Sequence, residues 1–140
     1  MKRFITLALL VCGAITLVGC QSPKERMTLL DTITEISISK SGGYGGINEN
    51  YFSSFSDLEI TSAFEEIMKS AKIKDEKVNE EKPDYDILVN YENGDTHLLH
   101  LILGDKGENS VLMYVGHESN TYFVSPDATL ELRKLLKVEE

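Results

Sequence analysis

The sequence predicts a single α+β domain, in which two helices pack on one face of an antiparallel sheet of about five strands, in the order β-α-β-β-β-β-α. Three observations predict this fold. Residues 57–72 have helical periodicity, short strand-like segments joined by turn residues follow from residue 84, and a second amphipathic segment ends the chain. The predicted domain spans residues 32–140 and leaves a hydrophobic N-terminal segment outside it.

The N-terminal segment has the layout of an export signal. Lys2 and Arg3 are followed by an uncharged apolar run of about fifteen residues, which is shorter than the roughly 20 residues of a membrane-spanning helix. The run ends in Leu17-Val18-Gly19-Cys20, which resembles the lipobox of bacterial lipoproteins. The resemblance implies that residues 1–19 are a signal peptide and that a diacylglyceryl group on Cys20, with acyl chains such as palmitate, anchors the mature protein.

Cleavage before Cys20 changes both the charge and the thiol content. The full chain of 140 residues carries a formal charge of −9, and the loss of Lys2 and Arg3 brings the mature chain to −11. So acidic a chain does not attract phosphate backbones, and nucleic acid is not an expected partner. Cys12 leaves with the signal peptide and Cys20 is alkylated, so no disulfide is expected. Residues 20–31 should form the lipidated cysteine and a tether on the extracytoplasmic face of the cell membrane.

The first predicted strand ends at a glycine-rich turn. Thr34, Ile36 and Ile38 alternate with polar residues, which is typical of a half-buried strand. The turn from Gly42 to Gly46 lacks the Gly-Lys-Ser/Thr ending of a phosphate-binding P-loop. A mobile turn is therefore the simplest interpretation, although its exposure also suits a docking loop.

The first helix has a start signal of its own. Ser56 and Glu59 have the spacing of a capping box, so the helix should begin at Asp57. An apolar stripe on this helix includes Phe64 and Met68, which we expect in the core.

From Asp84 the pattern indicates a meander of strands. Asn93-Gly94 predicts a two-residue type I′ turn after the first of them. The next strands are expected over residues 96–103, 111–115 and 122–124. Ser125 is positioned to cap the last helix, with Pro126 at its first position.

The three histidines do not form a metal motif. His97 and His100 are three residues apart on a strand, so they should point to opposite faces and do not chelate one ion together. His117 precedes Glu118, but the spacing of the zinc-protease helix is absent. Ordinary surface or hydrogen-bonded histidines are the expected interpretation.

No other motif assigns chemistry. The sequence contains no Gly-x-Ser-x-Gly elbow, and the mature chain has no free thiol nucleophile. The sequence therefore predicts no enzyme and no catalytic, cofactor-binding or metal-ligating residues. Six acidic residues that could attract calcium lack the ordered spacing of a calcium loop and are expected in a solvated connector: Asp75, Glu76, Glu80, Glu81, Asp84 and Asp86.

Segments along the whole mature domain resemble one family. They are residues 36–44 with Asn48, Phe64 and Ala71 on the helix, residues 82–86, residues 100–104 with Met113, and residues 121–125. Together they are similar to the YhfM-like domain of small lipoproteins from Gram-positive bacilli, over about residues 33–137. The family is one of uncharacterised function, so the resemblance implies the anchor and the fold and supplies no site residues.

Three functions are compatible with these observations. The favoured one is a non-catalytic binding or interaction domain, held by Cys20 at the membrane. The alternatives are an inhibitor or regulator of a cell-envelope hydrolase or extracellular protease, with an envelope protein as partner, and a calcium-binding surface domain. A ligand site would be indicated if the loop from Gly42 to Gly46, His100 and Tyr114 converged on one concave patch.

Overall fold

A computed structural model of the chain describes residues 25–74, 78 and 82–138. The predicted signal peptide and the predicted lipid attachment at Cys20 lie outside the described residues. Neither helix within the described part has the length and apolar character that a bilayer crossing requires. The elements in chain order are β1 (Ile33–Lys40), β2 (Ser53–Phe55), α2 (Leu58–Ser70), β3 (Lys72–Ile73), β4 (Tyr85–Tyr91), β5 (Thr96–Ile102), β6 (Ser110–Tyr114), β7 (Tyr122–Val124) and α3 (Pro126–Leu136).

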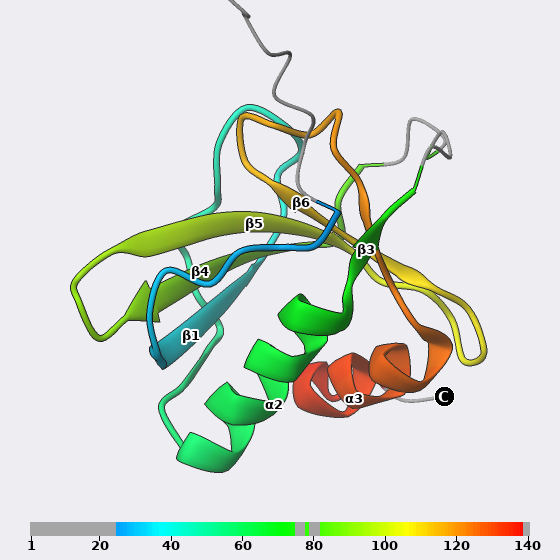
Figure 1. The fold of residues 1–140 in the computed structure, drawn as a ribbon. Coiled ribbons are helices and arrows are strands. Elements are labelled where there is room, and N and C mark those ends of the chain that lie inside the picture. Colours follow the sequence, from blue (N-terminus) through cyan, green and yellow to red (C-terminus); the bar gives the residue numbers. More distant parts are fainter. Residues whose placement is uncertain (1–24, 75–77, 79–81, 139–140) are drawn as a thin grey trace, which may run out of the picture.

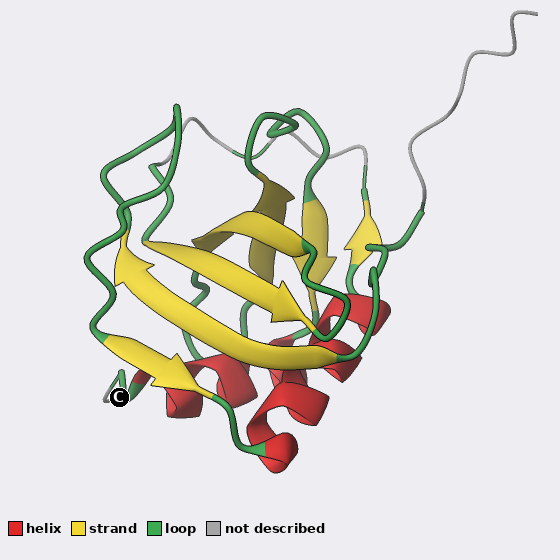
Figure 2. Cartoon of the chain, turned by 90° about the vertical axis from the view of Figure 1, so that its left-hand side faces the viewer, coloured by secondary structure: helices red, strands yellow, loops and turns green. Residues whose placement is uncertain are grey.

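The strands form one antiparallel sheet in the order β2-β1-β4-β5-β6-β7-β3. Both helices lie on the same side of this sheet (Figure 1), and the sheet curves over them (Figure 2). The predicted α+β class and the placement of the helices are confirmed, whereas about five strands is too low a number. The two additional strands, β2 and β3, have three and two residues and are too short to show a period of two in the sequence.

The core fills the space between the sheet and the helices. Phe64 and Met68 of α2 are 1% and 0% exposed, as their spacing predicts. The apolar residues that alternate along the central strands complete this layer: Ile36, Ile38, Ile87, Val89, Leu99, Leu101 and Leu112.

The two helix starts differ from each other in how well the sequence predicts them. Ser125 caps α3 as expected, because its hydroxyl accepts from the backbone N–H of Ala128 at 3.2 Å. The prediction of a capping box between Ser56 and Glu59 is wrong. Asp57 occupies the N-cap position of α2, and its side chain makes no cap hydrogen bond. Pairing of Phe55 with β1 keeps the chain extended to that point, so the turn into the helix comes one residue later than predicted.

The hairpin between β4 and β5 exists, but its turn is not the predicted type I′ turn. Asn90 pairs with Thr96, and the N–H of Tyr91 donates to the carbonyl of Asp95 at 3.0 Å. Residues 92–94 therefore form a three-residue loop, in which Gly94 has φ +88° and Asn93 does not have a positive φ. The Asn93 side chain accepts from the N–H of Asp95 at 2.9 Å, which stabilises this longer turn.

Part of the segment that the sequence assigns to the tether packs on the domain. Met27 is 5% exposed, Leu29 packs against the core, and Arg26 forms a bridge with Lys72 at the start of β3. The N–H of Thr28 donates to the hydroxyl of Tyr114 at 3.0 Å. This segment passes beside the sheet before β1 begins (Figure 1).

Candidate functional site

The face of the sheet that points away from the helices carries a buried polar pair. Asp86 on β4 and His100 on β5 are directly opposite each other in the register, and both are fully buried. Asp86 Oδ1 lies 2.8 Å from His100 Nδ1, and Asp86 Oδ2 accepts from the backbone N–H of Asn48 at 2.7 Å. The carboxylate thus fixes the orientation of the imidazole, and His100 donates through Nδ1.

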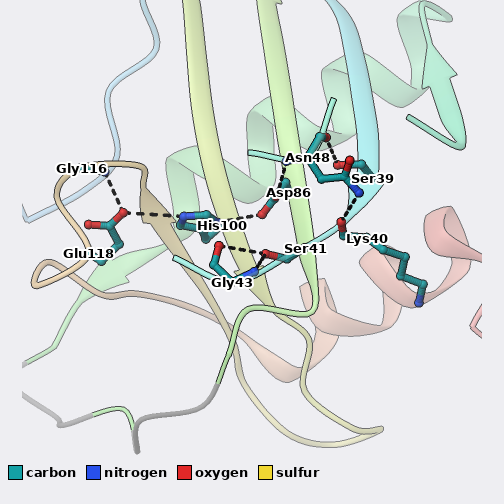
Figure 3. A network of polar contacts seen from close by, with 9 residues as sticks. All are labelled: Ser39, Lys40, Ser41, Gly43, Asn48, Asp86, His100, Gly116 and Glu118. Atoms are coloured by element: carbon teal, nitrogen blue, oxygen red, sulfur yellow. Dashed lines mark hydrogen bonds and ion pairs between the residues drawn. The ribbon is translucent and has the colours of Figure 1, made fainter. Parts of the chain in front are cut away.

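The loop between β1 and β2 covers this pair. The ring of Tyr44 meets the ring of His100 edge to face, with centroids 5.4 Å apart. Asn48 is held by its side-chain amide, which donates to the Lys40 carbonyl at 2.8 Å, and its own carbonyl accepts from the Ser39 hydroxyl (Figure 3). The predicted glycine-rich turn is therefore a cover over buried polar groups.

The glycines of this loop are needed for its path. Gly43, Gly45 and Gly46 have φ values of +112°, +104° and +147°, which side chains with a Cβ rarely adopt. These glycines flank Tyr44, and their backbone conformations let the loop place the Tyr44 ring over His100.

The second ring nitrogen of His100 faces a carboxylate from another loop. Nε2 has no hydrogen-bond partner among the described residues, and Glu118 Oε1 lies 3.6 Å from it. Glu118 Oε1 accepts from the backbone N–H of Gly116 at 2.7 Å, and this hydrogen bond is the main reason that the pKa of Glu118 is lowered. Figure 3 shows the row formed by Asp86, His100 and Glu118.

A separate pocket lies near the turn end of β5. Its volume is about 730 Å³, which is in the range of small-molecule sites. The ring of His97 contacts the ring of Tyr114 at 4.8 Å between centroids, and Tyr114 meets Tyr122 at 5.7 Å. The lining is completed by residues from the N-terminal segment, from β5 and from the end of β6 and the loop after it: Thr28, Thr96, Leu98, Val115, His117 and Asn120.

His97 is a neutral group in this pocket. Burial lowers the pKa of His97, and the negative charge of Asp95 offsets part of this decrease. Nδ1 lies 2.7 Å from the hydroxyl of Tyr91, whose own pKa is raised chiefly by burial. We therefore assign Tyr91 as the donor to Nδ1, which leaves the His97 proton on Nε2.

The structure separates the residues whose convergence on one concave patch would have indicated a ligand site. His97 and His100 point to opposite faces, as predicted: His97 packs on Tyr114, and His100 lies under Tyr44. The glycine-rich loop thus meets His100, while the ring of Tyr114 packs on His97 at the turn end of β5. His117 lines that same pocket.

The acidic run is only partly described. Asp75, Glu76, Glu80 and Glu81 lie outside the described residues. The two others are already engaged, because Asp84 Oδ2 accepts from the N–H of Leu103 at 2.8 Å and Asp86 binds His100. The described part of the chain contains no group of three or more acidic, histidine or cysteine side chains arranged to hold a metal ion.

These features define a small α+β domain with a buried polar pair on one face of its sheet and an aromatic pocket at the turn end of β5. The chain belongs to the YhfM protein family, whose sequence model matches residues 31–140. A thioesterase-like protein from Clostridium sporogenes has a similar fold, with a TM-score of 0.58 and 22% identity over 76% of this chain and 96% of that chain. No curated protein matches the sequence.

Proposed function

We propose that the protein is a lipid-anchored, extracytoplasmic binding domain, and that its ligand occupies the pocket formed by His97, Tyr114 and Tyr122. The pocket itself is the observation that supports this function most. It offers apolar ring faces beside a few fixed polar groups, the combination that small-molecule sites share.

The chemistry of the pocket indicates the class of ligand. Tyrosine rings present flat apolar surfaces that suit a ring-shaped molecule. Nε2–H of His97 is available as a donor, and the amide of Asn120 offers both a donor and an acceptor. A net charge of −11 on the mature chain opposes anions, so the proposed ligand is uncharged or cationic.

The proposed anchor would place this pocket close to the membrane. Thr28 lines the pocket and lies eight residues after Cys20. A fully extended chain of that length reaches at most about 29 Å. Lipidation of Cys20 would therefore hold the pocket near the outer surface of the bilayer, where it could receive a ligand from the envelope.

Binding is proposed in preference to catalysis. A serine or cysteine hydrolase places its nucleophile in hydrogen-bond reach of a histidine. Within the described part of the chain, His100 Nε2 has no hydrogen-bond partner of any kind. The fold neighbour is called thioesterase-like, which makes thioester hydrolysis the most informative activity to test.

A turnover panel decides between the two functions. The chain from Gln21 retains every described contact, since these involve residues 25–138 only. It would be tested against an acyl thioester and a p-nitrophenyl ester, beside its His100→Gln variant. We expect no difference between the two proteins. If the purified protein hydrolyses either substrate and His100→Gln does not, catalysis would replace binding as the proposed function.

A second candidate function is favoured by exposed aromatic groups. Tyr44 and Phe52, in and just after the glycine-rich loop, are 50% and 48% exposed. Exposed aromatic side chains are typical anchors of protein interfaces, so the loop would suit the docking of an envelope hydrolase or protease. Cross-linking from Tyr44 in intact cells tests this alternative, and capture of no such enzyme would argue against it.

A further inference from the structure

His100 Nε2 and Glu118 Oε1 are two hydrogen-bond acceptors that face each other, with no donor between them in the described part of the chain. His100 donates through Nδ1 to Asp86, so Nε2 has a lone pair when the ring carries a single proton. That lone pair is fully buried and faces a carboxylate oxygen at 3.6 Å. The distance is too long for a hydrogen bond, and two facing acceptors repel each other unless a positive species lies between them.

We propose that a divalent transition-metal ion such as Zn²⁺ binds between His100 Nε2 and the Glu118 carboxylate. Zinc binds histidine nitrogen at about 2.0–2.1 Å and carboxylate oxygen at about 2.0–2.2 Å. A nitrogen and an oxygen 3.6 Å apart can therefore be ligands of one ion with an open angle between them.

Asp86 supplies the outer support that such a ligand requires. Metal-binding histidines generally donate their other N–H to a carboxylate, which fixes the ring and makes it a better ligand. Asp86 does this at 2.8 Å and is itself fixed by the N–H of Asn48. Asp86 is thus a positioning residue, and the ion would link β5 to the loop that carries Glu118.

The protein would provide two ligands, with water or a donor atom of another molecule in the remaining positions. This predicts weaker binding than in the closed sites with four protein ligands. The Glu118 carboxylate is held in place by the backbone N–H of Gly116, which donates to Oε1 at 2.7 Å, and the acidity of the mature chain attracts cations. Access requires movement of Tyr44, whose ring is half exposed.

Titration with Zn²⁺ alone tests the proposal, by calorimetry and by ¹⁵N spectra of the histidine rings in the chain from Gln21. We expect saturable 1:1 binding that shifts the Nε2 signal of His100. Glu118→Gln keeps an oxygen for the Gly116 N–H and removes the charge, so it should weaken binding at least about tenfold. Glu92→Gln, an exposed carboxylate in the β4–β5 turn, is the matched control and should not change it.

Three results would overturn the proposal. They are the absence of binding at millimolar Zn²⁺, equal binding by Glu118→Gln and the original chain, and an Nε2 signal that shows a bound proton which Zn²⁺ does not displace. His100→Gln provides a second variant that should also lose binding. Ligand binding at the His97 pocket is measured separately, so failure of the metal site leaves the proposed function standing.

Discussion

Asp86 and His100 form a hydrogen bond of 2.8 Å between neighbouring strands, in a part of the sheet where both side chains are fully buried. The glycine-rich loop closes over them and supplies a third partner, the backbone N–H of Asn48. Loss of the carboxylate would leave two buried donors without an acceptor.

Asp86→Ala should lower the free energy of unfolding by about 3–5 kcal/mol, because it removes one partner from a buried, hydrogen-bonded pair. Urea unfolding followed by circular dichroism measures this loss. Asp105→Asn is the control, since the Asp105 side chain is 86% exposed, and it should change stability by less than about 0.5 kcal/mol. Equal effects of the two variants would show that the pair is not a stabilising contact.

The two strand histidines should have opposite tautomers. His100 donates through Nδ1 to Asp86, while His97 accepts at Nδ1 from Tyr91. Long-range ¹H–¹⁵N correlation spectra at neutral pH should therefore show the proton on Nδ1 in His100 and on Nε2 in His97. The same tautomer in both rings would contradict the assigned hydrogen bonds.

Acid should destabilise the protein through His97. Burial lowers its pKa below the unperturbed value of about 6.5, so the unfolded chain binds protons more readily than the folded one. The free energy of unfolding must then fall as the pH drops through about 6.5. Between pH 7.5 and 5.5, the original chain should lose more stability than His97→Gln. Parallel curves would mean that the pKa of His97 is not lowered by folding.

Cys20→Ala should abolish lipid labelling and processing. In the proposed pathway the lipid would be transferred to the thiol of this residue in the predicted lipobox, and cleavage would follow between Gly19 and Cys20. Cells grown with labelled palmitate should contain a labelled original protein and an unlabelled, uncleaved variant. The variant Cys12→Ala serves as control and should be labelled normally. A labelled Cys20→Ala protein would remove the basis for the proposed anchor.

Much of the fold follows from local patterns. The periodicity around Phe64 and Met68 identifies the α2 core face, and Ser125 with Pro126 identifies the start of α3. The edge strands β2 and β3 are set by pairing with β1 and β7 over two or three residues. Such short pairings leave no period in the sequence.

The buried pair was missed because of one residue of register. A two-residue turn at Asn93-Gly94 would pair Glu92 with Asp95 and put Leu101 opposite Asp86. The observed three-residue turn pairs Asp86 with His100 instead. The two turns differ in the backbone conformation of Asn93, which has no positive φ here and whose side chain accepts from the N–H of Asp95 at 2.9 Å. Sequence preference for Asn-Gly does not separate the two turns.

The aromatic pocket could not be found from spacing either. His97, Tyr114 and Tyr122 come from three strands, and Thr28 comes from a segment that the sequence assigns to the tether. These residues become neighbours only through the order of the strands in the sheet. The sequence did predict that His97 and His100 point to opposite faces of the sheet, because this depends only on the alternation of side chains along a strand.

Ligand mapping with a blocked pocket is the most direct test of the proposed function. Thr96 and Thr34 are both exposed threonines on strands, but only Thr96 lines the pocket. A library of uncharged and cationic ring compounds would be screened by NMR against the chain from Gln21, Thr96→Trp and Thr34→Trp. We predict binders that shift the signals of His97 and Tyr114, with binding lost in Thr96→Trp and kept in Thr34→Trp. Compounds that bind Thr96→Trp as well as the original chain would contradict the proposed ligand site. The absence of any binder at millimolar concentration would also contradict it.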